Sequence, residues 1–146
     1  HGNGTQHIFE HDAQIFYAST HQMPLYPGTG ARGEKRVGNI CNAPLPPFAG
    51  SDEFRDAYEE IVLPAIDRFR PELIMISAGF DAHRADPLAS LELEAEDFGW
   101  VTERLCEMAK VHCGGRLVST LEGGYDLQAL AESSAAHVAA LLGAKI

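Results

Sequence analysis

The chain has 146 residues, of which 45% are hydrophobic, a composition typical of one globular domain or part of one. Its 21 acidic residues outnumber its 11 basic ones and give a formal net charge of −10, which argues against direct binding to nucleic acids, because that binding needs clustered cations. Apolar runs stay well short of the ~20 residues of a membrane span, and the three cysteines follow no metal or disulfide spacing, so we expect a cytoplasmic protein without a membrane partner.

The first third of the chain predicts short elements around a long loop. A short helix is expected over Thr5 to Glu10, followed by a strand over Ile15 to Ser19, an apolar run of strand length. The segment from His21 to Val37 is rich in proline and glycine, and a loop this long in a compact domain is usually functional or disordered. A second strand is expected from Asn39 to Leu45, before two prolines.

A longer helix is predicted from Ser51 to Phe69. Ser51 offers an N-cap hydroxyl, acidic residues occupy the first turn, and one apolar stripe runs along the helix. Pro64 interrupts that stripe and should kink or break the helix, because proline lacks a backbone donor. The next run, Leu73 to Ala78, is apolar without alternation, which is typical of a strand covered on both faces in a parallel sheet.

The last third repeats the alternation of helix and strand. Helical spacing runs from Glu94 to Val111, and a strand is expected from Arg116 to Leu121. Asp126 then caps a last helix, Leu127 to Leu142. The acidic residues at the start of the first of these helices are predicted to lie in solvent: Glu92, Glu94, Glu96 and Asp97. The alternation predicts an α/β fold, a parallel sheet sandwiched between helices, in which ligands bind beyond the carboxyl ends of the strands.

Polar groups follow two of the predicted strands. One strand runs into Gly79-Phe80-Asp81, and a carboxylate held at a strand end suits a metal ligand because it is anionic at neutral pH. The competing interpretation of Asp81 is a helix cap or a loop hydrogen bond. The other strand runs into Gly123-Gly124-Tyr125, where a phenol could donate a hydrogen bond to an oxyanion beside a metal, or could pack in a tight turn.

Four motifs, in order and in register, resemble the histone deacetylase family. They are His1-Gly2-Asn3-Gly4-Thr5-Gln6, Tyr26-Pro27-Gly28-Thr29-Gly30, Ser77-Ala78-Gly79-Phe80-Asp81-Ala82-His83 with Asp86-Pro87-Leu88, and Leu121-Glu122-Gly123-Gly124-Tyr125. The resemblance covers residues 1–146, as the C-terminal portion of a single catalytic domain, and points to the class II and bacterial branch with acetoin-utilisation and acetylpolyamine amidohydrolase-like proteins. It implies an arginase-like α/β fold and one zinc ion, held by two aspartates and a histidine.

The resemblance also implies roles for particular residues. Asp81 matches the second zinc aspartate, and Tyr125 matches the catalytic tyrosine that hydrogen-bonds the acetyl carbonyl and its oxyanion. Four residues match positions that line or border the narrow substrate tunnel: Tyr26, Leu88, Gly123 and Gly124. The family also binds monovalent cations, such as potassium, and the matching residues, mostly through backbone oxygens, are Phe9, Asp12, Ile15 and Ser19.

Part of the family's site is missing from the sequence. The resemblance places the first zinc aspartate and the histidine ligand in an Asp-x-His text just before the position of His1, and a catalytic pair of histidines further upstream. Because catalytic zinc needs three protein ligands and a water, we expect a chain that is truncated at its N-terminus and inactive alone. The intact parent is expected to remove the acetyl group from acetyl-lysine in a protein or from an acetylated polyamine.

Alternatives stay open. Another acyl group or amine is possible within the family, and a folded interaction or structural fragment without metal is possible outside catalysis. An arginase-type hydrolase is disfavoured, because two manganese ions need more Asp and His ligands. His83 either orients Asp81 or faces solvent, whereas the other histidines match no ligand spacing and should lie on the surface or pack in the core: His7, His11, His21, His112 and His137. The sequence predicts no oligomeric state.

Overall fold

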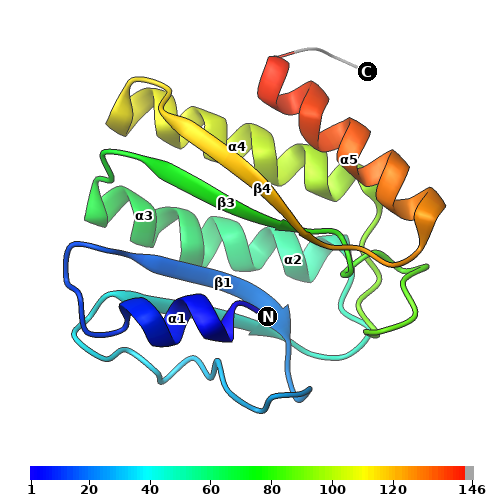
Figure 1. The fold of residues 1–146 in the computed structure, drawn as a ribbon, viewed down its shortest axis with the longest axis horizontal. Helices are drawn as coiled ribbons and strands as arrows, with labels where there is room; N and C mark the ends of the chain where they lie inside the picture. Colours follow the sequence, from blue (N-terminus) through cyan, green and yellow to red (C-terminus); the bar gives the residue numbers. More distant parts are fainter. Residues whose placement is uncertain (144–146) are drawn as a thin grey trace.

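The computed structural model describes residues 1–143, in which helices and parallel strands alternate (Figure 1). The elements, in chain order, are α1 Asn3–Phe9, β1 Tyr17–Gln22, β2 Ile40–Leu45, α2 Ser51–Ala57, the π-helical turn η1 Tyr58–Val62, α3 Leu63–Phe69, β3 Ile74–Gly79, α4 Ala95–Cys113, β4 Leu117–Gly123 and α5 Leu127–Leu142. Within residues 1–143, none of the helices is long and apolar enough to cross a membrane.

The four strands form two parallel pairs. β1 pairs with β2 in unbroken register, with Tyr17 opposite Ile40. β3 pairs with β4, and an irregularity after Ala78 brings Gly79 opposite Gly123. The carboxyl ends of the strands, and the loops that follow β3 and β4, lie on the right-hand side of Figure 1. This arrangement gathers the predicted site loops at one end of the molecule.

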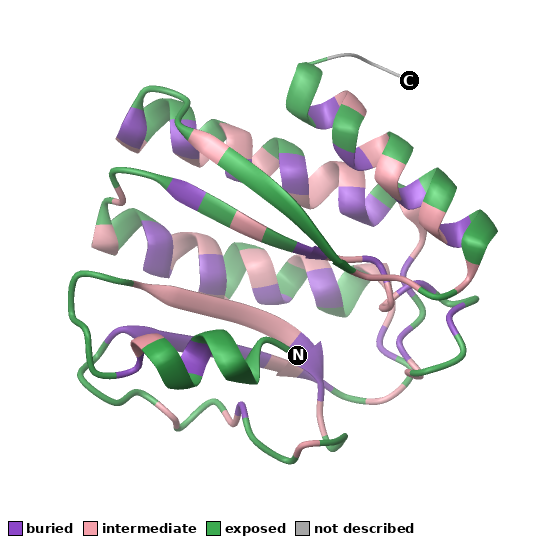
Figure 2. Cartoon of the chain, viewed as in Figure 1, coloured by how far each residue is buried: buried purple, intermediate pink, exposed green. Residues whose placement is uncertain are grey.

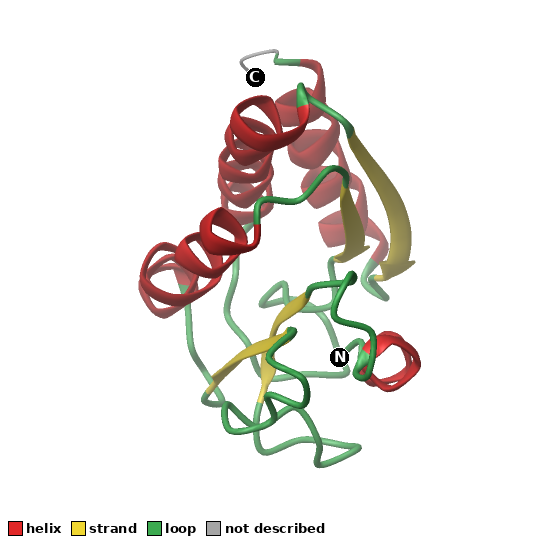
Figure 3. Ribbon diagram, turned by 90° about the vertical axis from the view of Figure 1, so that its left-hand side faces the viewer, coloured by secondary structure: helices red, strands yellow, loops and turns green. Residues whose placement is uncertain are grey.

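One hydrophobic core joins both pairs of strands to the helices. It combines side chains of β2 and β3 with side chains of α2, α3 and α4, among them Ala43, Leu45, Ile74, Ala78, Phe54, Ile66, Phe98 and Leu105. Figure 3 shows α2 and α3 on one side of the β1–β2 pair, and α1, next to the N-terminus, on the other. The predicted α/β class is confirmed, because parallel strands and helices share one core.

The two strand pairs differ in burial. β2 is almost inaccessible at Ile40 and Ala43, which are 2% and 0% exposed. In β3, by contrast, Met75 is 73% exposed, and Figure 2 shows exposed residues along most of β4. The prediction that the strand of residues 73–78 is covered on both faces is therefore wrong for this chain, since no described helix covers the face that carries Met75.

The long helix predicted from Ser51 to Phe69 is present, and it changes type in the middle. The π-helical turn η1 ends at Val62, and Pro64 occupies the first turn of α3. The proline therefore marks a change of helix type and not a break, because the backbone stays helical from Ala57 to Leu63 and a π turn accommodates a missing donor. Ser51 is not the N-cap: Gly50 is, and the Ser51 hydroxyl instead donates to Asp97 Oδ2 at 2.7 Å.

Asp97 lies in the interior and not in solvent. Its side chain is 0% exposed, and its carboxylate accepts hydrogen bonds from the Arg55 guanidinium at 2.8 Å and from the backbone N–H of Glu94 at 3.0 Å. The prediction of a fully solvated acidic run is wrong at this residue, because a buried carboxylate becomes tolerable once a cation and N–H donors surround it. Asp97 thereby ties the start of α4 to α2.

Candidate active site

The loops after β1, β3 and β4 carry the residues for which a site was predicted. Two hydrogen bonds tie these loops together. The backbone N–H of Ser90 donates to Gln22 Oε1 at 2.7 Å, which joins the loop after β3 to the end of β1. The backbone N–H of Phe80 donates to Gly123 O at 2.8 Å, which joins the ends of β3 and β4. The carboxyl edges of the two strand pairs are therefore held as one surface.

Asp81 lies in a space that two glycines leave open. A Cβ atom at Gly79 would stand 2.9 Å from Asp81 Oδ1, and one at Gly123 would stand 3.2 Å from Asp81 Cγ. Side chains at these positions would displace the carboxylate, so the glycines set its place. Among the described residues, the Asp81 carboxylate accepts no hydrogen bond from a backbone or side-chain donor and makes no ion pair, so it forms neither a helix cap nor a loop hydrogen bond. Both oxygens are available to a ligand.

Asp81 by itself supplies one metal ligand. Within residues 1–143, no group of three or more His, Cys, Asp and Glu side chains could hold a metal ion. A zinc ion accepts a carboxylate oxygen and needs further protein ligands beside it. The residues of this chain thus fit one part of a zinc site and do not complete it.

Tyr125 projects from the turn between β4 and α5. Gly124 has φ 139°, and a Cβ there would stand 2.9 Å from Leu130 Cδ1, so this position favours glycine for two reasons. The Tyr125 side chain is 56% exposed, and its hydroxyl has no partner among the described residues. The alternative of a packed aromatic ring does not describe it. The phenol is available as a hydrogen-bond donor at the same edge as Asp81.

The other predicted substrate residues flank this edge. Tyr26, after β1, is 90% exposed, and Leu88, after β3, is 61% exposed. Gly123 ends β4 against Asp81, and Gly124 begins the turn to Tyr125. Exposed apolar side chains on loops at a strand edge are consistent with a substrate surface. Their assignment to an acyl-lysine tunnel stays a prediction.

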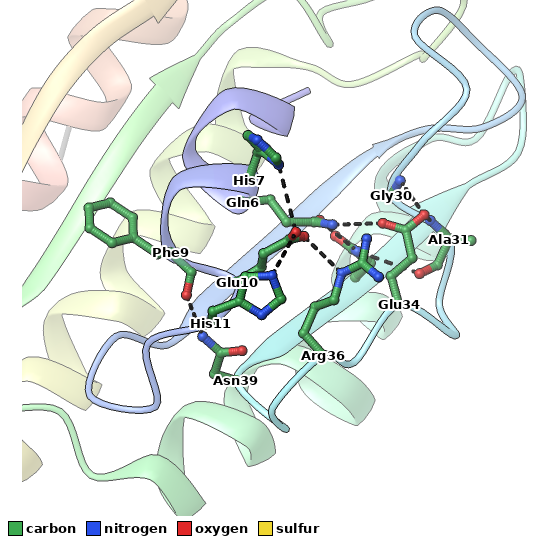
Figure 4. Close-up of polar contacts among 11 residues, drawn as sticks. Gln6, His7, Phe9, Glu10, His11, Gly30, Ala31, Glu34, Arg36 and Asn39 are labelled. Atoms are coloured by element: carbon green, nitrogen blue, oxygen red, sulfur yellow. Dashed lines mark hydrogen bonds and ion pairs between the residues drawn. The ribbon is translucent and has the colours of Figure 1, made fainter.

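The predicted cation residues surround an asparagine that sequence reasoning missed. The backbone oxygens of Phe9, Asp12 and Ile15 accept hydrogen bonds from Asn39 Nδ2 at 2.8, 3.0 and 2.9 Å. Figure 4 shows the bond between Asn39 and Phe9. Ser19 lies apart from them, and its hydroxyl contacts His21 Nδ1 at 2.9 Å. Three carbonyl oxygens that converge on one point suit a monovalent cation, but here the amide nitrogen of Asn39 takes that place. A potassium site stays a prediction.

The histidines of the chain differ in their burial and in their hydrogen-bond partners. His21 and His137 are buried, and burial lowers the pKa of each imidazole. His7 and His11 are exposed on either side of Glu10, as Figure 4 shows. His83 neither faces solvent nor contacts Asp81: it is 8% exposed, and its Nδ1 accepts a hydrogen bond from the backbone N–H of Ala85 at 3.1 Å. Both alternatives for His83 are therefore wrong.

Comparisons with known proteins identify the family and the fold that this chain is similar to. The family described as "Histone deacetylase domain" matches residues 1–141. A "Probable deacetylase" of Archaeoglobus fulgidus is 45% identical, over 98% of this chain and 41% of the relative. "Histone deacetylase 10, chloroplastic" of Oryza sativa subsp. japonica is 45% identical, over 98% of this chain and 33% of the relative. The crystal structure of the HDA15 HD domain superposes with a TM-score of 0.91 at 36% identity, covering 99% of this chain and 42% of that one.

The chain spans about two fifths or less of the length of these relatives. The rice relative is named chloroplastic, so the predicted cytoplasmic location of this chain stays a prediction. The matched fold is that of a deacetylase domain, as the motifs implied.

Proposed function

This chain belongs to the histone deacetylase family, and we propose that residues 1–146 form the C-terminal portion of one zinc-dependent catalytic domain that hydrolyses the acetyl amide of acetyl-lysine or of an acetylated polyamine. One observation carries the proposal. Within residues 1–143, the Asp81 carboxylate has no protein partner and lies against Gly79 and Gly123, at the edge where the Tyr125 hydroxyl also has none. A carboxylate that can bind a metal, at the same sheet edge as a hydrogen-bond donor, suits metal-assisted hydrolysis of an amide.

The roles of this chain's residues follow from that arrangement. Asp81 would hold zinc through a carboxylate oxygen. Zinc, when bound, supplies a Lewis acid for the acetyl carbonyl and a water. The Tyr125 hydroxyl would donate a hydrogen bond to the carbonyl oxygen and stabilise its negative charge as the amide carbon becomes tetrahedral. Tyr26 and Leu88 would contact the acyl chain, and a histidine outside this chain would take the proton from the water.

The chain alone is expected to bind zinc weakly and to show no turnover. Within the described residues, Asp81 is the one candidate ligand at this edge, whereas a catalytic zinc site takes three. The remaining ligands would come from the part of the whole protein that the longer relatives have in addition. Deacetylation of an acetyl-lysine peptide by residues 1–146 above a no-protein control would contradict this expectation.

The proposal is tested by Asp81→Asn in the full-length protein. An amide is a much poorer ligand for a divalent cation than a carboxylate, so zinc affinity and deacetylase activity should fall together, by at least roughly 10- to 100-fold. Elemental analysis gives the zinc content, and an acetyl-lysine peptide gives the activity. Asp52→Asn makes the same change on an exposed residue of α2 and should alter neither. Unchanged zinc content in Asp81→Asn would show that Asp81 is a loop residue with no part in zinc binding.

A non-catalytic interaction or structural role is the second candidate. The observation that favours it is that no group of three or more His, Cys, Asp and Glu side chains within residues 1–143 could hold a metal ion. Full-length protein that contains zinc and deacetylates a peptide or an acetylated polyamine would exclude this role. Full-length protein that binds no zinc would support it.

A further inference from the structure

We propose that Asp86 is a positioning residue that aims Tyr125 at the reacting carbonyl, an inference that rests on the proposed function. Asp86 lies in the loop after β3 and is 7% exposed. Its Oδ2 accepts a hydrogen bond from the backbone N–H of Tyr125 at 2.8 Å. Its Oδ1 accepts one from the backbone N–H of Leu88 at 3.0 Å. One carboxylate therefore holds the backbone of the proposed oxyanion donor and that of a proposed substrate contact.

The backbone of Tyr125 needs such an external acceptor. β4 ends at Gly123 and α5 begins at Leu127, so the Tyr125 N–H belongs to neither a strand ladder nor a helix. Gly124, just before it, has φ 139°, a conformation that other residues rarely adopt. The turn is thus an irregular piece of backbone, and the bond to Asp86 joins it to a segment 39 residues away.

The side chain of Tyr125 gives a second reason. Its ring is 56% exposed, and its hydroxyl has no partner within residues 1–143. A ring that is not held by packing takes its direction from its backbone. Because a displacement of about 1 Å at a reacting group can cost on the order of 10²-fold in rate, the acceptor on that backbone affects the chemical step.

Asp86 is suited to this work as a carboxylate. It accepts two N–H donors at once, and hydrogen bonds to an ionised acceptor are stronger than neutral ones. Among the described residues, Asp86 forms no ion pair, and its side-chain oxygens accept hydrogen bonds only from the backbone N–H groups of Leu88 and Tyr125. Its contribution is to geometry, through Tyr125, and not to proton transfer.

The test is a double-mutant cycle in the zinc-loaded full-length protein. Asp86→Ala removes both acceptors, Tyr125→Phe removes the phenol donor, and the double variant combines them. On an acetyl-lysine peptide, Asp86→Ala should lower kcat by roughly 10- to 100-fold with zinc content unchanged. In the Tyr125→Phe background the same substitution should cost less than about threefold, because a positioning residue has nothing left to position.

Two further variants keep the outcome clear. Asp86→Asn retains one acceptor oxygen and nearly the same shape, so it should lower kcat less than Asp86→Ala does. It replaces Asp86→Ala in the test if the alanine variant fails to fold. Asp126→Ala removes the neighbouring carboxylate, which caps α5 by accepting from the Ala129 N–H at 2.8 Å, and should lower Tm while kcat stays near wild type. The matched pair separates positioning of Tyr125 from general support of the turn.

Each result decides the proposal. Normal kcat in both Asp86 variants, with Tyr125→Phe impaired, would overturn the role of Asp86 and leave the proposed function intact. Losses that multiply in the double variant would also overturn it, as would failure of both Asp86 variants to fold. Normal kcat in Tyr125→Phe, or no deacetylation by the wild-type protein, would instead contradict the proposed function.

Discussion

Around α1 and the loop of residues 30–39, side-chain hydrogen bonds link Gln6 to Glu34 (Figure 4) and to Asn42. At the carboxyl ends of β3 and β4, two side chains differ from these, the Asp81 carboxylate and the Tyr125 phenol. Gln6 Nε2 donates to Glu34 Oε2 at 2.6 Å, and Gln6 Oε1 accepts from Asn42 Nδ2 at 3.0 Å. Asp81 and the Tyr125 hydroxyl have no such partners within the described chain. Most polar groups inside a fold are hydrogen-bonded within it, whereas a polar group that binds a ligand needs bonding capacity that the fold does not use.

The backbone differs in the same sense. Glu34 also accepts from the backbone N–H groups of Gly30 and Ala31, at 2.9 and 3.0 Å, so its side chain fixes an otherwise irregular loop. Beside Asp81, by contrast, Gly79 and Gly123 have no side chains, and the Asp81 carboxylate occupies the space that this leaves. Substitutions in the first region should therefore change stability, and substitutions in the second should change ligand binding and catalysis.

The largest expected effect comes from closing the space beside Asp81. Gly123→Ala would place a Cβ 3.2 Å from Asp81 Cγ, so the carboxylate must move by a few tenths of an ångström. In the full-length protein we expect zinc affinity to fall roughly 10- to 100-fold, measured by competition with a chelator, with little change in Tm. Gly33→Ala, where a Cβ meets nothing within 4 Å, should leave zinc affinity unchanged. Wild-type zinc affinity in Gly123→Ala would remove the proposed distinction between the regions.

A smaller effect, on stability, is expected in the network around α1. Glu34→Ala leaves the buried Gln6 amide without its acceptor, and an unsatisfied buried donor costs about 1–3 kcal/mol of unfolding free energy. Urea unfolding measures the loss. Glu60→Ala, on an exposed residue of η1, should stay within about 0.5 kcal/mol of wild type. Equal losses in the two variants would show that the network does not hold the loop.

The smallest expected effect is a pH dependence of the unfolding free energy that arises at His137. It tests whether hydrogen-bonded polar groups also stabilise the α4–α5 region. The Thr102 hydroxyl donates to Phe98 O at 2.6 Å and therefore accepts from His137 Nδ1, while Nε2 accepts from Ser119 at 2.8 Å. Both nitrogens are satisfied in the neutral ring, and burial lowers its pKa below the ordinary 6.5.

The sign of the pH effect follows from that shift. Below pH 6.5 the unfolded chain takes up a proton more readily than the folded one, so the unfolding free energy should fall as pH drops through that value. His21, whose pKa burial also lowers, adds an effect of the same sign. His137→Gln should show a shallower fall than wild type between about pH 8 and pH 5 in urea unfolding. An identical slope would mean that His137 titrates alike in both states.

Element type could be predicted from sequence where local chemistry decides it. The predicted strand at residues 39–45 matches β2, and the helix from Leu127 to Leu142 matches α5 in full. An irregularity near Pro64 was predictable because a missing donor acts within one turn, although the helix changes type there and does not break. The first strand was placed at Ile15 to Ser19 from its apolar residues, but β1 runs from Tyr17 to Gln22, because pairing with β2 sets its limits.

The sequence by itself determined the motifs, their order and the family, since these depend on residue identity along the chain. Only the tertiary structure decided which polar groups are hydrogen-bonded within the fold. Buried Asp97 forms an ion pair with Arg55, and Asn39 Nδ2 donates to three backbone carbonyl oxygens. Asp86 accepts a hydrogen bond from the N–H of Tyr125, 39 residues away in the sequence. These contacts join segments far apart in sequence, and no local periodicity encodes which donor meets which acceptor. The physical reason is that saturation of a polar group depends on the fold around it, whereas its chemical type does not.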